Sequence, residues 1–378
     1  MSGCANFGFP APRRKTRAVS LGPLAIGGGA PVSVQTMASV DTRDAAAAAA
    51  QAIECFEAGA DLVRFAVPDM AAAVSLREIK RRLGPDRPIV ADIHFDHRLA
   101  LAAIEGGVEG LRLNPGNIGP ASKVREVAAA ALERGVVVRV GVNAGSVAPD
   151  VLARHGGATA AALVESALCG IKLLEDAGLA AVKASVKASD AARCVEAYRM
   201  LSAATDVPLH VGLTEAGTLR RGTVASAAAI GVLLGEGIGD TIRISLTAPP
   251  AEEVRAGLDL LRALGLREGG ASVTSCPTCG RTRCDVVSVA EAAEAALEEL
   301  YRQRPGAPRP RVAVMGCVVN GPGEARDADL ALVGGEGCFW LYRRGVRETR
   351  VPESGAVAAL VAAAAAFGQS GDGGNPCR

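Results

Sequence analysis

Short apolar runs alternate with longer amphipathic stretches along most of the chain. Eight runs precede residue 250, at Val32–Met37, Leu62–Val67, Ile89–Ile93, Gly110–Leu113, Val136–Val142, Ala180–Val186, Leu209–Leu213 and Thr241–Leu246. Segments with helical periodicity lie between them, at Arg43–Ala58, Met70–Leu83, Arg98–Glu105, Ala121–Arg134, Thr159–Ala177, Ala188–Thr205 and Thr223–Gly235. Most of these segments end at a glycine, as helices commonly do. This alternation predicts a parallel sheet, and eight such units fit an α/β fold of the closed (β/α)8 TIM-type barrel class.

The pattern changes after a helix predicted at Ala251–Leu264, where Gly265–Ala271 has the composition of a linker. A small α+β region follows, with a predicted helix at Val289–Arg302 and apolar, strand-like runs at Arg311–Met315, Ala328–Val333 and Cys338–Tyr342. We therefore expect a barrel domain over residues 1–264, a second domain over 272–367 and a disordered tail over 368–378. A doubly wound open sheet is the alternative for the first domain. However, Gly27-Gly28-Gly29 lacks the Gly-x-Gly-x-x-Gly spacing of that fold.

Polar residues interrupt the apolar runs near their carboxyl ends, where barrel enzymes carry their active sites. The basic residues on the predicted strands are Arg64, Arg112, Arg139, Lys183 and Arg243. Further candidates at strand ends are Asp92, His94, Asn114, Asn143, Glu215 and Ser245. A single buried cation can be a paired structural ion, but unpaired buried cations cost several kcal/mol each. Because Asp92 and Glu215 are too few to neutralise all of them, we expect the barrel mouth to bind a multiply charged anion such as a diphosphate.

Cysteines mark the second domain. Cys276-Pro277-Thr278-Cys279 forms a Cys-x-x-Cys pair on a loop, and Cys317 follows a strand-like run, with Glu324 after a Gly-Pro-Gly turn. Three thiolates and one oxygen ligand suit an iron–sulfur cluster that has one reactive iron. A structural zinc site remains the alternative, since Cys284 or Cys338 can complete a four-thiolate set.

Composition narrows the possible partners and the compartment. The 41 basic and 40 acidic side chains nearly cancel, and aromatic residues make up only 3% of the chain. Both features argue against a nucleic-acid-binding surface. We expect no signal peptide and no membrane span, and therefore a cytoplasmic protein whose 10 cysteines stay reduced.

The motifs together resemble one enzyme family, the bacterial 4-hydroxy-3-methylbut-2-enyl diphosphate synthases in their short form. The matching stretches are Val34–Met37, Val90–Asp96, Leu111–Gly119, Gly141–Ser146, Lys183–Asp190, Thr214–Gly217, Cys276–Cys279 and Gly316–Glu324. They occur in one order over most of residues 30–325, so the resemblance is specific. Cys284 and the run Thr218-Leu219-Arg220-Arg221 depart from the family pattern.

The resemblance implies a chemistry and a set of ligands. It implies a [4Fe–4S] cluster held by Cys276, Cys279, Cys317 and Glu324. The implied reaction is the two-electron reductive opening and dehydration of 2-C-methyl-D-erythritol 2,4-cyclodiphosphate, a step of isoprenoid precursor synthesis. Reduced flavodoxin or ferredoxin is the implied electron donor, and a homodimer the implied assembly. The basic residues on the barrel strands then hold the diphosphate, while Asp92, His94 and Glu215 are candidates for handling protons.

Two rival hypotheses keep a zinc site instead of a cluster. One is a non-redox phosphate- or pterin-binding barrel transferase with structural zinc, and the other is a zinc-stabilised binding or scaffold protein. Iron content separates them from the redox enzyme, because only a cluster gives a brown protein with about four irons per chain.

Overall fold

The computed structural model describes residues 9–269, 272–304 and 306–368. The chain divides into two compact units, residues 1–267 and 268–378. Most of the predicted disordered tail, residues 369–378, lies outside the described residues. None of the helices in the described ranges combines the length and the apolar character that crossing a membrane requires.

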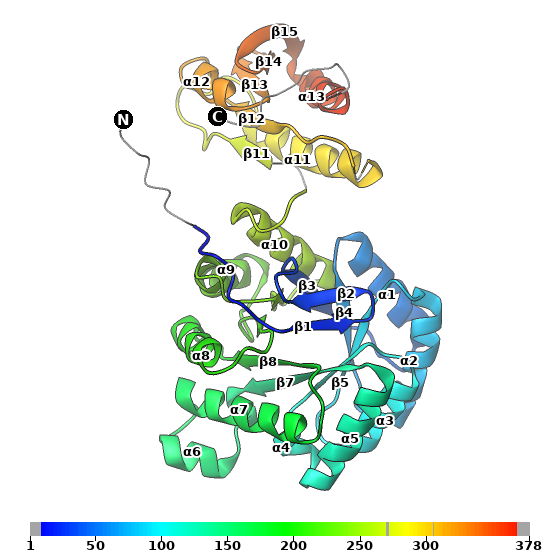
Figure 1. Cartoon of the computed structure of the whole chain (residues 1–378). Coiled ribbons are helices and arrows are strands. Elements are labelled where there is room, and N and C mark those ends of the chain that lie inside the picture. The colour runs from blue at the N-terminus through cyan, green and yellow to red at the C-terminus, as the bar shows by residue number, and fades with distance from the viewer. Residues whose placement is uncertain (1–8, 270–271, 305, 369–378) are drawn as a thin grey trace. The chain divides into compact units, whose positions relative to one another are not determined.

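Unit 1 is built on an eight-stranded parallel sheet in the order β8-β7-β6-β5-β4-β3-β10-β9 (Figure 1). Its strands are β3 (Ser33–Met37), β4 (Leu62–Ala66), β5 (Ile89–Asp92), β6 (Gly110–Leu113), β7 (Val137–Asn143), β8 (Val182–Lys187), β9 (His210–Val211) and β10 (Thr241–Ile242). A parallel bridge between Ala184 and Leu209 joins the two ends of the sheet. The predicted (β/α)8 barrel is therefore confirmed, and the eight predicted runs all contain a strand.

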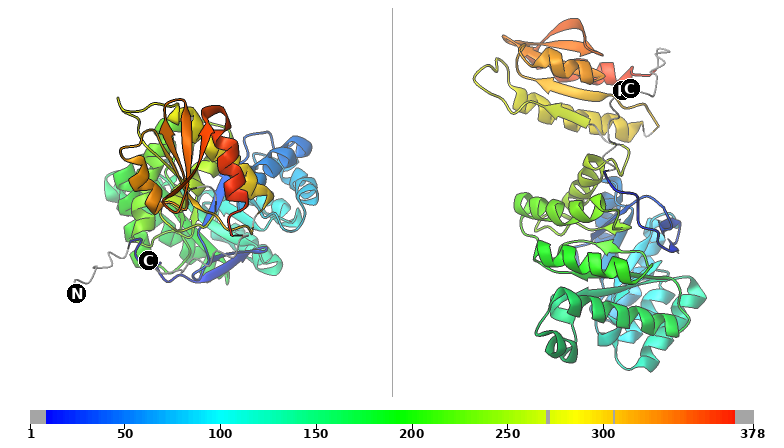
Figure 2. Two further views of the ribbon diagram at one scale, coloured as in Figure 1. Left: turned by 90° about the horizontal axis from the view of Figure 1, so that it is seen from above. Right: turned by 60° about the vertical axis from the view of Figure 1, so that its left-hand side comes forward.

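Helices surround this sheet on its outer side (Figures 1 and 2). They are α1 (Ala45–Glu57), α2 (Met70–Leu83), α3 (His97–Glu105), α4 (Pro115–Ile118), α5 (Ala121–Arg134), α6 (Pro149–His155), α7 (Ala160–Asp176), α8 (Ala191–Ala204), α9 (Leu219–Gly235) and α10 (Pro250–Ala263). Several begin at an aspartate whose carboxylate accepts an otherwise unpaired backbone N–H, as Asp44, Asp69 and Asp190 do. The short helices α4 and α6 were not predicted, since each is too brief to show a hydrophobic period.

A hairpin of β1 (Ala18–Leu21) and β2 (Leu24–Gly27) covers one end of the barrel. Val19, Leu21 and Ile26 of the hairpin form an apolar cluster with Val90 and Val137, which lie at or near the amino ends of their strands. The hairpin thus plugs the amino-terminal end of the barrel. The opposite end, where the strands carry their carboxyl termini, remains for a functional site.

Unit 2 contains a five-stranded sheet in the order β11-β12-β13-β14-β15. The strands are β11 (Ser272–Ser275), β12 (Arg311–Met315), β13 (Leu330–Gly335), β14 (Cys338–Arg343) and β15 (Val346–Pro352), and the helices are α11 (Val286–Gln303), α12 (Gly321–Asp327) and α13 (Ala356–Ala365). β11, β12 and β13 run parallel, whereas β14 and β15 form an antiparallel meander. The core between the sheet and α11 and α13 includes Leu297, Phe339 and Leu360, all fully buried.

Candidate functional site

A cavity of about 170 Å³ lies at the carboxyl ends of the barrel strands. Its lining is Arg64, Asp92, His94, Arg112, Arg139, Asn143, Lys187, Thr214, Arg243 and Ser245. The side chains come from β4, β5, β6, β7, β8 and the segments that follow β5, β9 and β10. The lining therefore carries five cations and one carboxylate, Asp92. So positive a cavity is suited to an anion.

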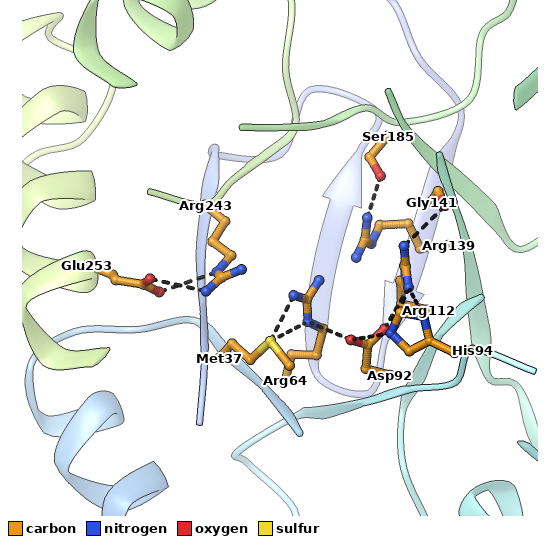
Figure 3. Close-up of polar contacts among 10 residues, drawn as sticks. All are labelled: Met37, Arg64, Asp92, His94, Arg112, Arg139, Gly141, Ser185, Arg243 and Glu253. Atoms are coloured by element: carbon orange, nitrogen blue, oxygen red, sulfur yellow. Dashed lines mark hydrogen bonds and ion pairs between the residues drawn. The ribbon is translucent and has the colours of Figure 1, made fainter. Parts of the chain in front are cut away.

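Asp92 connects two of the arginines (Figure 3). Arg112 Nη1 donates to Asp92 Oδ1 at 3.2 Å, and Arg64 Nε lies 3.8 Å from Asp92 Oδ2. Burial alone would raise the pKa of this carboxyl, but Arg64, His94 and Arg112 hold that pKa well below its usual range. Asp92 is consequently ionised, and its single charge fixes the orientation of two guanidinium groups. Arg64 also donates to the sulfur of Met37 at 2.8 Å, a weak acceptor that adds little compensation to the charge that Arg64 shares with Asp92.

Arg139 is buried with two of its donor nitrogens unpartnered within the described ranges. It is only 2% exposed, and its Nη1 donates to the hydroxyl of Ser185 (Figure 3). Its Nε and Nη2 are buried without a hydrogen-bond partner among the described residues. Burial, and then the charges of Arg64 and Arg112, lower the pKa of Arg139 well below its ordinary value. Arginine nevertheless stays protonated in proteins, so this lowering expresses a free-energy cost that a bound anion would relieve.

Two glycines on the inner wall make room for these cations. A Cβ at Gly141 would lie 2.6 Å from Arg112 Nε, and a Cβ at Gly212 would lie 2.6 Å from Lys187 Nζ. Real Cβ atoms do not approach other atoms so closely, so any side chain at either position must displace a cation. Glycine at these positions therefore serves the site, because it allows long basic side chains to cross the barrel interior.

Arg243 is held from outside the barrel by Glu253 of α10 (Figure 3). Glu253 accepts from Arg243 Nε at 3.3 Å and Nη2 at 3.1 Å, from the hydroxyl of Thr36 at 2.8 Å and from the backbone N–H of Leu246 at 3.0 Å. The Glu253 residue is 4% exposed, so these bonds satisfy a carboxylate that would otherwise be costly to bury. Glu253 thus fixes Arg243 against the strand end without itself lining the cavity.

A second polar layer lies below the cavity. Lys183 Nζ donates to the hydroxyl of Thr241 at 3.4 Å, and burial, reinforced by Arg139, lowers the pKa of Lys183 to about 7. His210 is fully buried, and neither of its ring nitrogens has a partner among the described residues. Burial and the neighbouring cations lower the pKa of His210 well below its ordinary value, so the ring is neutral.

The structure gathers most, but not all, of the predicted site residues of the barrel. The cavity lining includes the predicted residues Arg64, Asp92, His94, Arg112, Arg139, Asn143, Arg243 and Ser245. Three predicted residues do not line it. Lys183 lies in the deeper layer. Asn114 caps α4 by accepting from Gly116 N–H at 3.2 Å and donates to the Ser146 carbonyl at 3.0 Å, and Glu215 is exposed on a loop with a φ of 55°.

Three residues that matter to the cavity were not among the predicted site residues. Lys187 and Thr214 line it, and Glu253 supports it. The signal for Lys187 is the period of a strand, since residues two apart share a face and Lys183 and Lys187 are four apart on β8. Nothing in the sequence distinguishes Glu253 from its neighbour Glu252 at the start of α10.

The predicted cluster ligands lie at the carboxyl edge of the sheet in unit 2. Cys276 follows β11 and Cys317 follows β12, and these strands are adjacent and parallel, so the two cysteines leave the sheet at the same edge. Gly316 N–H donates to Cys276 Sγ at 3.2 Å. Hydrogen bonds from the Arg281 backbone and side chain lower the pKa of Cys279 and favour its thiolate. N–H donors aimed at thiolates are typical of iron–sulfur sites, so this donor set fits such a cluster.

A single metal ion requires its ligands to lie closer together than a cluster does. No group of three or more His, Cys, Asp or Glu side chains within the described ranges is close enough to hold one ion. A cluster places each ligand on a different iron, so its ligands lie further apart than those of one ion. Cys284 lies beside this edge, where its thiol donates to the Gly316 carbonyl at 3.7 Å. Its sulfur fills the space that a Cβ at Gly334 would need, 2.1 Å away, and burial raises its pKa to about 11. Cys338 is buried and accepts from Arg350 Nε at 3.1 Å.

Glu324 lies in a helix instead of after a turn. The expected Gly-Pro-Gly turn is the first turn of α12, and Glu324 N–H donates to the Asn320 carbonyl at 3.2 Å. Pro322 suits a first helical turn because its missing N–H has no partner to lose there. Glu324 follows Asn320 by four residues, on the segment that begins at Cys317. Its side chain is exposed.

Comparison with known proteins identifies the family. Residues 16–258 match the profile described as the GcpE TIM-barrel domain, and residues 272–366 match the GcpE protein C-terminal domain. The chain belongs to the GcpE family. The resemblance proposed from the sequence motifs is thereby confirmed.

Several relatives of this GcpE-family chain carry the same name, 4-hydroxy-3-methylbut-2-en-1-yl diphosphate synthase (flavodoxin). The relative from Geobacter sulfurreducens is 51% identical over 93% of this chain and 97% of its own. Those from Acidithiobacillus ferrooxidans and Symbiobacterium thermophilum are 49% and 50% identical over 93% and 92% of this chain, and over 94% and 92% of their own. Among solved structures, a dihydropteroate synthase from Thermus thermophilus matches 66% of this chain and 98% of its own at 18% identity and a TM-score of 0.46.

Proposed function

We propose that this chain is an oxidoreductase that converts 2-C-methyl-D-erythritol 2,4-cyclodiphosphate to 4-hydroxy-3-methylbut-2-enyl diphosphate. The proposal rests on family membership and on one observation of the site, the cavity in which five cations face one carboxylate. A cyclic diphosphate supplies the negative charge that this cavity lacks, and arginine forks bind phosphate oxygens in pairs. The rival non-redox transferase and the scaffold protein find no support in the names of the relatives.

The barrel residues bind and orient the substrate in this proposal. Arg112, Arg139 and Lys187 donate to phosphate oxygens, and the unpartnered Nε and Nη2 of Arg139 gain acceptors. Arg243 donates from the opposite wall, held in place by Glu253. Asn114 and Lys183 do not line the cavity but stabilise the structure around it. Asn114 orders the α4 turn, and Lys183 forms part of the second layer of polar contacts.

Protons for the dehydration come from groups beside the cavity. Asp92 is ionised and contacts His94, whose Nε2 lies 3.5 Å from Asp92 Oδ2, so His94 is our first candidate for donating a proton. Asp92 then orients the His94 ring. Glu215 remains a candidate only because of the uncommon backbone geometry of its loop position, where a non-glycine residue takes a positive φ of 55°.

We propose that Cys276, Cys279, Cys317 and Glu324 hold a [4Fe–4S] cluster in unit 2. When bound, the cluster supplies the two electrons that the reaction consumes, one at a time, and a Lewis-acidic iron. The thiolates are supported by the N–H donors of Gly316 and Arg281. A carboxylate is a harder and weaker ligand for iron than a thiolate, which suits an iron that must open a position.

We further propose a flavodoxin as electron donor, a homodimeric assembly and a cytoplasmic location. The names of the relatives support the flavodoxin, and the family resemblance alone supports the homodimer. Free cysteines such as Cys276 and Cys279 require a reducing compartment to stay available as cluster ligands, which supports the cytoplasm.

The test is turnover of the cyclic diphosphate by anaerobically purified protein. With reduced flavodoxin, the expected result is consumption of the cyclic diphosphate and formation of the linear diphosphate, detected by mass spectrometry, in a brown protein with about four irons per chain. A colourless, zinc-loaded protein that leaves the cyclic diphosphate intact would contradict the proposal.

A further inference from the structure

The two faces of the sheet in unit 2 are covered differently. α11 and α13 pack on one face. On the other face α12 packs against β12 and β13, and there Tyr342 joins a smaller core with Trp340 only partly buried at its margin. β15 is the edge strand (Figure 1), and nearly all its residues are exposed. The part of the sheet formed by β14 and β15 is thus left open on the α12 side.

Basic side chains occupy this open part. Arg347 places its guanidinium carbon 4.3 Å from the centre of the Trp340 ring, and Arg350 Nε reaches the sulfur of Cys338, so both arginines point to the face that Trp340 occupies. Arg326 at the end of α12 lies against Gly345 in the turn between β14 and β15. We call these four residues, Trp340, Arg326, Arg347 and Arg350, the Arg–Trp face.

The arginines of the Arg–Trp face lack carboxylate partners. Within the part of the chain that the structure describes, no ion pair involves Arg326, Arg347 or Arg350. The nearby Glu348 of β15 instead accepts from Arg343 at 3.0 Å. The carboxylates of α11, at Glu291, Glu294, Glu298 and Glu299, belong to the helix on the opposite face. On the α12 side, α12 itself carries Glu324 and Asp327, and within the described ranges neither forms an ion pair with these arginines.

The Arg–Trp face borders the edge that carries the cysteines. A Cβ at Gly335 would lie 3.9 Å from Trp340 Nε1 and 3.4 Å from Cys338 Sγ. A Cβ at the adjacent Gly334 would lie 3.0 Å from the carbonyl oxygen of Gly316, the residue before Cys317. Only the end of β13 thus separates the Trp340 ring from the segment of Cys317. Electrons that enter at this face reach the proposed cluster over a short path.

We propose that the Arg–Trp face docks the electron donor, a small acidic flavodoxin-type protein, an inference that rests on the proposed function. Short-lived redox complexes have small interfaces and depend on complementary charge for fast encounter. Arginine and tryptophan are the residues that most often dominate binding free energy at interfaces. Three cations without carboxylate partners, one of them stacked on the chain's single tryptophan, attract carboxylates around a donor's flavin. Each encounter oxidises the flavin by one electron, so two encounters supply the two electrons that the substrate takes up.

The experiment compares two sources of electrons in the holoenzyme. The double variant Arg347→Glu/Arg350→Glu should need at least tenfold more reduced flavodoxin for half-maximal rate, while its rate with a reduced viologen dye equals that of the parent. Arg311→Glu is the matched control, since Arg311 is a 70% exposed arginine at the start of β12, the opposite end from the cysteines. It should leave both rates unchanged. Raising the salt concentration should slow the flavodoxin-driven rate of the parent more than that of the double variant.

Further variants keep the test decisive. Arg347→Lys/Arg350→Lys retains the charge and should recover most of the flavodoxin-driven rate, and Arg326→Glu should show a smaller loss than the double variant. Equal dependence on flavodoxin in the parent and the charge-reversed variants would overturn the docking proposal. If the parent turns over with neither reductant, the proposed function fails. Docking is then judged by calorimetric titration of oxidised flavodoxin at low salt, where equal affinity for the parent and the double variant overturns it.

Discussion

The cavity of the barrel and the cysteine edge of unit 2 are built on opposite principles. In the barrel, most of the side chains that line the cavity stand on strands, many are almost fully buried, and several bond one another, as Asp92 and Arg112 do. At the cysteine edge, Cys279 is exposed on a loop, and within the described ranges no cluster of ligands is close enough for a single ion. The barrel thus presents a finished site for an anion, whereas the cysteine edge presents thiolates that a bound group must draw together.

This difference has an energetic side. The barrel keeps several like charges buried in a small space before any ligand arrives, and Arg139 is left with unpaired donors. Burying these like charges lowers the stability of the folded chain, and a bound anion offsets that loss by pairing with them. The cysteine edge buries no comparable charge, because its ligand groups lie near solvent. Substitutions should therefore affect the two regions independently.

The largest effect is expected at the cysteine edge. Cys276→Ser and Cys317→Ser each remove a soft thiolate ligand, so each should abolish iron binding and turnover. Cys284→Ser should spare both, because the Cys284 thiol packs against Gly334 and its pKa is raised to about 11. Iron content and visible absorption of anaerobically purified proteins provide the measurement. A brown and active Cys317→Ser protein would remove Cys317 from the ligand set.

Arginine substitutions in the barrel should weaken substrate binding without touching the iron. Arg112→Ala and Arg139→Ala each remove charge-assisted hydrogen bonds of about 1.5–3 kcal/mol, which corresponds to a roughly ten- to hundredfold loss of affinity. Titration calorimetry with the cyclic diphosphate measures the loss, and the visible spectrum should match that of the parent. Arg98→Ala is the control, since Arg98 is 72% exposed and pairs with Asp96 outside the cavity. Unchanged affinity in both barrel variants would assign these arginines to the fold alone.

A smaller effect is expected from a single methyl group at Gly141. In Gly141→Ala the new Cβ would lie 2.6 Å from Arg112 Nε, so Arg112 must shift away from its bond to Asp92. Overpacking of this kind costs roughly 1 kcal/mol or more, so substrate affinity should fall about fivefold while the barrel still folds. Gly231→Ala on α9 serves as control, because its Cβ would make only an ordinary contact of 3.7 Å with Leu260. Equal affinities in the two variants would show that Arg112 tolerates displacement.

The smallest effect on activity, but a clear effect on stability, is expected from Lys183. Its pKa is lowered from 10.5 to about 7 in the folded chain, so between these values the unfolded chain binds more protons. The free energy of unfolding should therefore rise as the pH increases from about 7 to 10, and be lowest below pH 7. Lys183→Met should flatten this rise by an amount on the order of a few kcal/mol. Urea unfolding at pH 7 and pH 9.5 measures it, with Lys172→Met, a 76% exposed lysine, as the control that keeps the slope of the parent.

The barrel could be predicted largely from periodicity. Strands buried on both faces give continuous apolar runs, so basic residues that recur inside several such runs stand out, and this is why Arg112 and Arg139 could be predicted to line a common cavity. The depth at which each residue lies inside the barrel could not be predicted. Lys183 and Lys187 share a face of β8, yet only Lys187 lines the cavity, because the stagger of the barrel decides which layer is open.

The second unit was harder to predict because its polar elements lack a hydrophobic period. β11 reads Ser-Val-Thr-Ser and β15 is almost entirely exposed, so neither has the apolar alternation of a half-buried strand. α12 begins with Gly-Pro-Gly, a composition typical of turns, and only packing of Ala325 and Gly321 against the sheet makes it a helix. Glu253 was missed for the same kind of reason, since its partner Arg243 is brought to it by the fold.

The most direct test of the central claim, that the barrel holds a finished anion site independent of the cluster, is calorimetric titration of the cyclic diphosphate into iron-free and iron-loaded protein. Binding is expected in both states, with affinities within a few-fold of each other, and Arg112→Ala should lose at least tenfold in affinity in both. Affinity should also fall with rising salt, as expected for an anion held by five cations. Binding that occurs only in the iron-loaded protein, or that Arg112→Ala leaves intact, would contradict the account.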